Sequence, residues 1–145
     1  MTNGDVTAIK DVQAYEDERN VEISQVGISG LRLPIEFSNG GQSQHSVMEA
    51  AFTVTLQKER KGTHMSRFIE TWDATEAPFT LAGVAPFLAA LEERLDAESA
   101  QCHLQFPLFY ERVAPVSQAK SVMDFECEII AKSNPDYIEL RLMAP

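Results

Sequence analysis

The residues best suited to chemistry lie between Lys58 and Phe68, where the chain reads Lys-Glu-Arg-Lys-Gly-Thr-His-Met-Ser-Arg-Phe. Gly62 lets the backbone turn or approach a ligand closely, and Thr63 or Ser66 carries a hydroxyl that can cap the following helix. Four cationic side chains fall within ten positions, although the formal net charge of the chain is -10: Lys58, Arg60, Lys61 and Arg67. This combination predicts a site for an anion such as a phosphate.

A basic cluster is also often no more than a solvated face, so the alternative interpretation is a wet turn with a capping serine. His64 by itself does not separate the two. An alternating apolar run precedes the segment and a short amphipathic run follows it, which predicts that a strand passes into a helix here.

Composition limits the kind of protein. With 145 residues, 44% of them hydrophobic, the chain is long enough for one compact domain. Its acidity disfavours nucleic acid as a partner, because such binding needs a basic face. No apolar run approaches the roughly 20 residues that cross a bilayer, and the polar start lacks a secretory signal, so we expect no membrane partner and a cytoplasmic location.

Cysteine usage does not indicate a protein held together by disulfides or by zinc. Cys102 and Cys127 are the only cysteines, and each falls inside a strand-like run. They predict buried, reduced thiols rather than a disulfide framework or a closed zinc site.

The first elements that position the basic segment are two strands around the turn at Asn39-Gly40-Gly41. Pro34 removes a donor from the first strand and predicts that this strand lies at an edge of the sheet or pairs on one side only at that point. Alternation gives each strand one buried face, comprising Leu31, Leu33, Ile35 and Phe37 in the first and Met48, Ala50, Phe52, Val54 and Leu56 in the second.

Two helices should follow the basic segment. The first is short, begins with Phe68, Ile69 and Trp72 at helical spacing, and is ended by Pro78. Pro86 should lie in the first turn of the second, where a missing donor is tolerated. An apolar stripe defines that second helix: Leu81, Val84, Leu88, Leu91 and Leu95.

Three strands complete the pattern, and the last is expected to point Ile138, Leu140 and Leu142 inward. The inward faces of the other two comprise Cys102, Leu104 and Phe106, and Met123, Phe125, Cys127, Ile129 and Ala131. The order ββααββ plus one extra strand at the C-terminus predicts an α+β fold, with an antiparallel sheet and two helices packed on one face.

The octapeptide Lys61-Gly62-Thr63-His64-Met65-Ser66-Arg67-Phe68 resembles the signature of type IB GTP cyclohydrolase I, the prokaryotic form of that enzyme family. Further matches follow in the family's order: Asp11-Val12-Gln13, Arg19-Asn20 before Val26-Gly27, Gln44-His45, Phe106-Pro107 with Phe109, Ala114-Pro115-Val116-Ser117 and Met123-Asp124-Phe125-Glu126.

The resemblance implies two tandem tunnelling-fold units per family member, and homo-oligomers with sites at subunit interfaces. This chain resembles only the amino-terminal half. Residues 1–20 are expected to form an extended or disordered arm, residues 21–134 a single tunnelling-fold (T-fold) domain, and residues 135–145 the opening strand of a second unit.

The chemistry implied by the resemblance is hydrolysis of GTP to 7,8-dihydroneopterin triphosphate and formate, the first step of tetrahydrofolate biosynthesis. A divalent metal ion such as zinc, manganese or iron would polarise the attacking water. In the family its Cys and His ligands belong to Cys-Pro-Cys-Ser-Lys and Gly-Ala-His-Asn-Gln-Arg motifs, and this sequence ends before both. Neither Cys102 nor Cys127 sits in such a motif, so no metal ligand is assigned.

Within the same resemblance, Lys61 and Arg67 would be counter-charges for the triphosphate, and Thr63 and Ser66 would be hydroxyl or cap donors. Backbone amides at the start of the helix would be further donors to the anion. His64 would be the catalytic residue that assists proton transfer, because an imidazole titrates near neutral pH. The alternative for His64 is a structural hydrogen bond across a subunit interface.

Three interpretations of the chain follow. The first is a truncated part of a metal-dependent GTP cyclohydrolase, inactive alone, whose missing half could come from a second polypeptide. The second is a non-catalytic T-fold protein that binds a purine or pterin or serves assembly. The third is a non-functional remnant.

Overall fold

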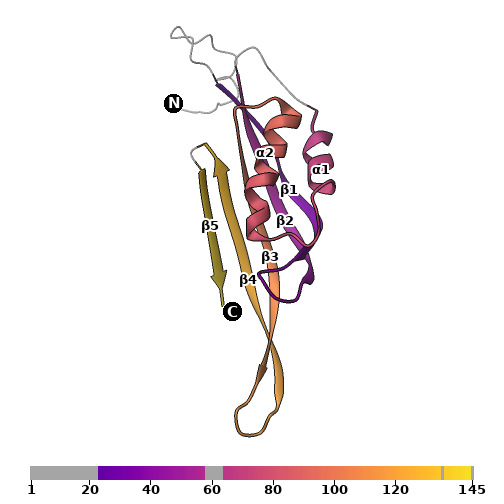
Figure 1. Cartoon of the computed structure of the whole chain (residues 1–145), viewed down its shortest axis with the longest axis vertical. Helices are drawn as coiled ribbons and strands as arrows, with labels where there is room; N and C mark the ends of the chain where they lie inside the picture. The colour runs from indigo at the N-terminus through magenta and orange to yellow at the C-terminus, as the bar shows by residue number, and fades with distance from the viewer. Residues whose placement is uncertain (1–22, 58–63, 135, 145) are drawn as a thin grey trace.

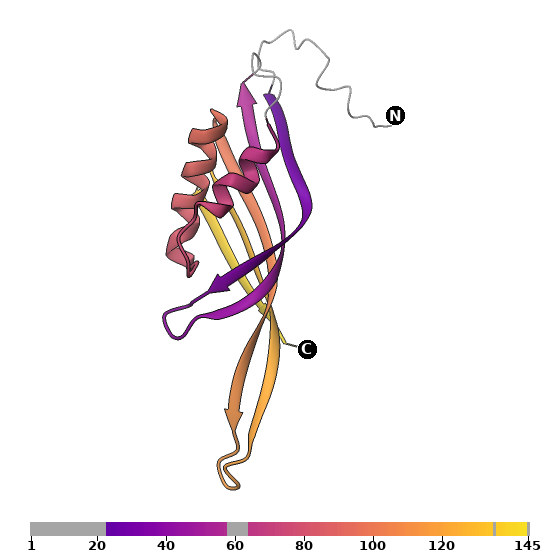
Figure 2. The same cartoon turned by 90° about the vertical axis from the view of Figure 1, so that its right-hand side faces the viewer.

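A computed structural model describes residues 23–57, 64–134 and 136–144 of the chain. It is an α+β structure in which a five-stranded antiparallel sheet has the order β1-β2-β3-β4-β5. The two helices lie over one face of this sheet, and no other described element covers the opposite face (Figures 1 and 2). The elements are β1 (Ile23–Phe37), β2 (Gln44–Gln57), α1 (Ser66–Asp73), a 3-10 turn η2 (Leu81–Gly83), α2 (Val84–Leu95), β3 (Ser99–Val113), β4 (Lys120–Ser133) and β5 (Asp136–Met143).

The first hairpin confirms the alternation in the sequence. Every predicted inward residue of β2 is buried, and Leu31 and Leu33 of β1 pack against the core at its margin. Pro34 lies in an edge strand, as predicted, because β2 is the only one of the five described strands that pairs with β1. Position 27 requires glycine because the backbones of β1 and β2 approach closely there. A Cβ atom on Gly27 would lie 2.4 Å from the carbonyl oxygen of Phe52.

The helices complete the core with an aromatic cluster. α1 buries Phe68, Thr71 and Trp72, and α2 buries its predicted stripe from Val84 onward. Phe87, which the stripe did not include, is also buried and packs edge-on against Trp72 with ring centroids 5.5 Å apart. Such aromatic pairs add stability beyond the apolar area that they bury.

The helix limits differ in one respect from the prediction. Pro86 falls in the first turn of α2, as expected. However, α1 ends at Asp73, well before Pro78, because the backbone leaves helical geometry at Ala74, where ψ is −4°, and the Thr75 N–H donates to the Trp72 carbonyl at 3.0 Å in a tighter last turn. The loop that follows is tied to β1, since the Phe79 N–H donates to the Glu36 carbonyl at 2.7 Å.

β3 and β4 continue as a two-stranded ribbon past the end of the helices (Figures 1 and 2). β3 passes through Pro107, whose carbonyl accepts a 2.7 Å hydrogen bond from the Ser46 hydroxyl. The Gln44 side chain then bonds both the N–H and the carbonyl of Phe109, at 2.8 and 2.7 Å. Where β2 turns away from β3, hydrogen bonds from the side chains of β2 thus take the place of backbone hydrogen bonds between the two strands.

The prediction for the last strand is wrong in its burial. β5 pairs with β4, and Ile138, Leu140 and Leu142 lie on the helix side of the sheet, but they are between 40 and 50% exposed. The reason is that α2 packs over β2, β3 and β4 and does not cover the fifth strand. The sheet therefore ends in an apolar strip that lies outside the core.

The predicted arm at residues 1–20 lies outside the described residues. None of the helices in the described part of the chain is long and apolar enough to span a membrane. The cysteine prediction is confirmed, since both thiols are free and buried. Burial raises the pKa of Cys102 to about 12, and burial together with the nearby Glu126 carboxylate raises the pKa of Cys127 to about 11.

Candidate functional site

The structure places the second half of the basic segment at the start of α1. His64, Ser66 and Arg67 are all exposed to solvent. The other predicted site residues, Lys61 and Thr63, lie outside the described residues. The corner between β2 and α1 therefore presents His64 and Arg67 together, with no part of the core covering them.

The capping role suggested for Ser66 is wrong. Ser66 is the first residue of the helix, and the preceding Met65 occupies the cap position without a side-chain hydrogen bond. The backbone N–H groups of Arg67 and Phe68 donate to the carbonyls of His64 and Met65, at 3.0 and 3.1 Å. Those two amides are already used, so an anion at this corner could not take its donors from them.

Arg67 has a structural contact that the sequence did not predict. Its Nη1 atom donates a 2.9 Å hydrogen bond to the carbonyl oxygen of Arg94, in the last turn of α2. Carbonyls at a helix C-terminus lack intrahelical partners, and a cation there also interacts favourably with the helix dipole. Arg67 therefore ties the two helices together.

Arg67 and Arg94 nevertheless keep unused positive charge. Among the residues that the structure describes, neither guanidinium lies within ion-pair distance of a carboxylate. A guanidinium has five N–H donors in a planar fork, and Arg67 uses Nη1 on the Arg94 carbonyl. The remaining donors suit a phosphate or a carboxylate.

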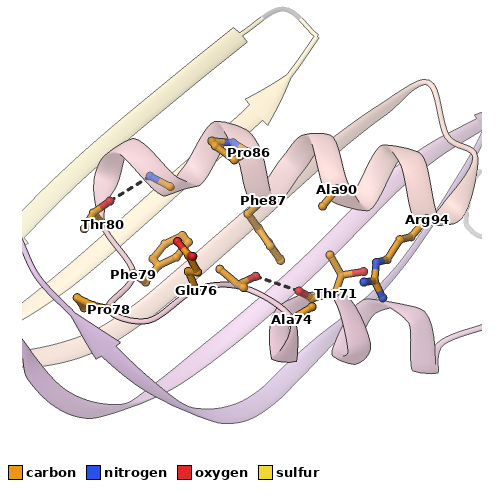
Figure 3. A pocket seen from close by; sticks show the side chains of 12 residues that line it. Thr71, Ala74, Glu76, Pro78, Phe79, Thr80, Pro86, Phe87, Ala90 and Arg94 are labelled. Atoms are coloured by element: carbon orange, nitrogen blue, oxygen red, sulfur yellow. Dashed lines mark hydrogen bonds between the residues drawn. The ribbon is translucent and has the colours of Figure 1, made fainter.

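A hollow of about 400 Å³ lies beside this corner, between the end of α1, the following loop and α2 (Figure 3). Arg94 and Thr71 lie toward one end of it, and Glu76 and Phe79 lie toward the loop. His64, Ser66 and Arg67 are not among the residues that line it. His64, Ser66 and Arg67 therefore lie outside this hollow, at the exposed start of α1.

A second polar cluster lies on the helix-free face of the sheet. Glu128 is only 7% exposed, although its place in the alternation is outward. Its carboxylate is 2.5 Å from His103 Nε2 and 3.5 Å from Arg141 Nη1. These neighbours compensate the cost of burying a charge.

Sequence reasoning missed this cluster because only strand register creates it. Register places five polar side chains in one row across the sheet, from β1 to β5: Arg32, Glu49, Gln105, Glu128 and Arg141. The sole signal in the sequence was the polar face of each strand, which does not say which residues become neighbours.

The described residues do not fit a divalent metal ion. They contain no group of three or more His, Cys, Asp or Glu side chains placed to hold one. Burial raises the pKa of Cys102 to about 12, and burial together with the Glu126 carboxylate raises the pKa of Cys127 to about 11. No step through a metal is therefore derived from this part of the molecule.

Fold and site together define an α+β domain with an exposed cationic corner and a polar sheet face. The model of the family "Type I GTP cyclohydrolase folE2" matches residues 9–144, and the chain belongs to this family.

Curated relatives agree with this assignment. The chain is 38% identical over 141 residues to GTP cyclohydrolase FolE2 1 of Dechloromonas aromatica, covering 94% of this chain and 53% of the relative. It is 40% identical over 134 residues to GTP cyclohydrolase FolE2 of Aromatoleum aromaticum, covering 91% and 49% respectively. For the FolE2 of Azoarcus sp. the values are 42% over 121 residues, 82% and 45%. The chain spans about half the length of the curated relatives it matches.

Proposed function

We propose that this chain contributes to a GTP cyclohydrolase I activity of type IB. The reaction is hydrolysis of GTP to 7,8-dihydroneopterin triphosphate and formate, the first step of tetrahydrofolate biosynthesis. The observation that carries the proposal is the family match over residues 9–144, which includes the basic segment. The names of the relatives, all of them GTP cyclohydrolases, support it.

In this proposal the corner at the start of α1 holds the triphosphate. Arg67 supplies a guanidinium with donors to spare, Lys61 adds charge, and Thr63 and Ser66 donate from their hydroxyls. His64 assists proton transfer from its exposed position. Support comes from the pairing pattern, because no described carboxylate neutralises Arg67 in a chain that is otherwise strongly acidic.

The architecture proposed for the whole protein is a pair of tunnelling-fold units in a cytoplasmic homo-oligomer. Residues 21–134 form the amino-terminal unit, residues 135–145 open the second, and residues 1–20 are an arm. The exposed apolar strip of β5 supports this, since further structure would cover it. The zinc, manganese or iron ion would be held by Cys and His side chains outside this sequence, in a longer chain or a second polypeptide.

A complementation assay tests the function. The purified chain alone should release no formate from GTP, and activity should appear when a polypeptide with the Cys-Pro-Cys-Ser-Lys and Gly-Ala-His-Asn-Gln-Arg motifs is added with a divalent metal. Arg67→Lys in the active complex should raise KM for GTP more than it lowers kcat, since it keeps the charge and loses the fork. Robust formate release by the chain alone would refute this account.

The second candidate function is a non-catalytic domain that binds a purine or pterin or serves assembly. It is favoured by the absence of a metal-binding group in the described residues. Calorimetry with GTP and native mass spectrometry separate the two. GTP binding by the chain alone, with no turnover in the complemented assay, would favour the binding domain.

A further inference from the structure

The hollow between α1, the following loop and α2 has the size of a small-molecule site (Figure 3). Its volume of about 400 Å³ falls within the range of ligand pockets in proteins. Residues with little or no side chain line part of it and leave the space open: Ala74, Gly83 and Ala90. Because an apolar cavity of about 150 Å³ can hold benzene, this hollow has room for one ring with a substituent at each end.

Two aromatic rings line the hollow. Phe79 and Phe87 lie with their ring centroids 6.4 Å apart and their planes at 88° to each other. Aromatic rings favour offset and edge-on contacts with one another, so these side chains suit an aromatic ligand. Both also contact Trp72, the single tryptophan of the chain, at centroid distances of 5.1 and 5.5 Å. The fluorescence of Trp72 can therefore report that a ligand has bound.

The two charged residues that line the hollow lie toward opposite ends of it. Arg94 is beside Thr71 at one end, and Glu76 is beside Phe79 at the other (Figure 3). In the described part of the chain, neither has an oppositely charged group within ion-pair distance. A guanidinium binds a carboxylate with two parallel hydrogen bonds, and a carboxylate accepts hydrogen bonds from an ammonium group. The two ends therefore complement a ligand that is anionic at one end and cationic at the other.

The hydroxyl groups on the α1 side of the hollow are already used as donors. The Thr71 hydroxyl donates to the Arg67 carbonyl at 2.6 Å, and the Thr75 hydroxyl donates to the Thr71 carbonyl at 2.9 Å. Both bonds stay within α1 and its last turn. Recognition of a charged ligand is therefore left to Arg94 and Glu76.

Backbone hydrogen bonds hold the loop side of the hollow in place. The Phe79 N–H donates to the Glu36 carbonyl at 2.7 Å, and the Phe79 carbonyl accepts from the Ser38 N–H at 2.9 Å. Where the loop enters α2, the Gly83 N–H donates to the Thr80 hydroxyl at 3.2 Å. The hollow is thus formed before a ligand binds, which lowers the entropic cost of binding.

We propose that this hollow binds a small aromatic zwitterion, a single ring with a carboxylate at one end and an amino group at the other. The carboxylate pairs with the Arg94 guanidinium, and the ammonium group donates to the Glu76 carboxylate. The ring between them lies against Phe79 and Phe87. None of the described residues assigned to GTP lines the hollow, so the inference goes beyond the proposed function.

Titration of the 145-residue chain with 4-(aminomethyl)benzoate tests the proposal, followed by calorimetry and by the fluorescence of Trp72. The dissociation constant of this probe should be about 1 mM or lower. Two analogues keep the ring and lose one charge each: 4-methylbenzoate lacks the ammonium group, and 4-methylbenzylamine lacks the carboxylate. Each should bind at least about tenfold more weakly, because one charged end of the hollow loses its partner.

Two matched pairs of variants locate the binding site. Arg94→Gln and Arg112→Gln each remove one exposed positive charge, the first in the hollow and the second on β3 beyond the helices. Arg94→Gln keeps the backbone carbonyl that accepts from Arg67, and it should raise the dissociation constant about tenfold or more, against less than about twofold for Arg112→Gln. Ala90→Leu fills the hollow and should abolish binding, whereas Ala89→Leu, on the same helix but outside the hollow, should not.

The analogue series on the unchanged protein needs no variant and can overturn the proposal by itself. It does so if the zwitterion shows no saturable binding at about 10 mM, or if either analogue binds as tightly as the zwitterion. The proposal also fails if Arg94→Gln or Ala90→Leu binds the zwitterion as tightly as its control variant. None of these measurements involves GTP, so zwitterion binding without cyclohydrolase activity in the complemented assay would refute the proposed function and leave this site intact.

Discussion

One end of β3 and β4 lies beneath the helices and the other end extends beyond them, and the two ends differ in the exposure of their apolar side chains. Beneath the helices, alternate residues such as Leu104, Phe106 and Ile129 are fully buried. Beyond the helices the same two strands expose apolar side chains such as Phe109 and Val122. At the covered end the two strands are also flanked by β2 and β5, and beyond it they have neither helix nor neighbouring strand in the described part of the chain. The covered end therefore serves stability, and the uncovered end is available for contacts with other molecules.

The largest effect should come from the covered end. Phe52 is fully buried and packs against Trp72 and Phe87. Phe52→Ala should destabilise the domain by about 3–5 kcal/mol, through lost contacts and a residual cavity. Phe109→Ala, at the exposed end, is the matched control and should cost less than about 1 kcal/mol. Equal losses in urea denaturation would remove the distinction between the two ends.

The next effect concerns the buried carboxylate on the helix-free face. Glu128→Ala should destabilise by about 1–3 kcal/mol, because His103 and Arg141 lose the acceptor that they share. Glu111→Ala is the control, since its pair with Lys120 is exposed and such pairs contribute about 0–1 kcal/mol. The comparison is made by urea denaturation, and a Glu128 variant no weaker than the control would show that the cluster is not structural.

A smaller effect is expected at the corner of α1. Arg67→Ala should lower stability by about 1 kcal/mol, since the Arg94 carbonyl loses its donor. Arg67→Lys should recover part of that stability because it keeps a positive charge beside the helix C-terminus. The melting temperatures of both variants measure this, and unchanged melting of Arg67→Ala would leave the residue without a structural role.

The smallest effect at neutral pH concerns the thiols. Burial raises the pKa values of Cys102 and Cys127 to about 12 and 11, above the ordinary range of a free thiol. As pH rises, the two thiols therefore lose their protons in the unfolded chain before they do so in the folded protein. The contribution of the protonated thiols to the free energy of unfolding is complete below about pH 9 and is lost as pH rises toward 11–12. A thiol reagent at pH 8 should label native protein far more slowly than protein in urea. Rapid native labelling would contradict burial beneath the helices.

Much of the covered end could be predicted from the sequence. Strict alternation in Met48 to Leu56 and the stripe in α2 require one buried face whatever the neighbours are. The site was predictable only in part. Residue types at His64 and Arg67 pointed to an anion, but the bond from Arg67 to the Arg94 carbonyl joins residues far apart in the chain, and no local pattern encodes it.

The sequence by itself determined the order of elements, the inward face of each covered strand, the buried thiols and the family, because side-chain periodicity and short motifs are local properties. Only the tertiary structure decided that the apolar residues of β5, Ile138, Leu140 and Leu142, lie beyond α2. It also decided that Glu128 is buried between His103 and Arg141, and that β3 and β4 extend past the ends of the helices. The physical reason is that burial depends on where another element stops, and strand register selects which distant side chains become neighbours.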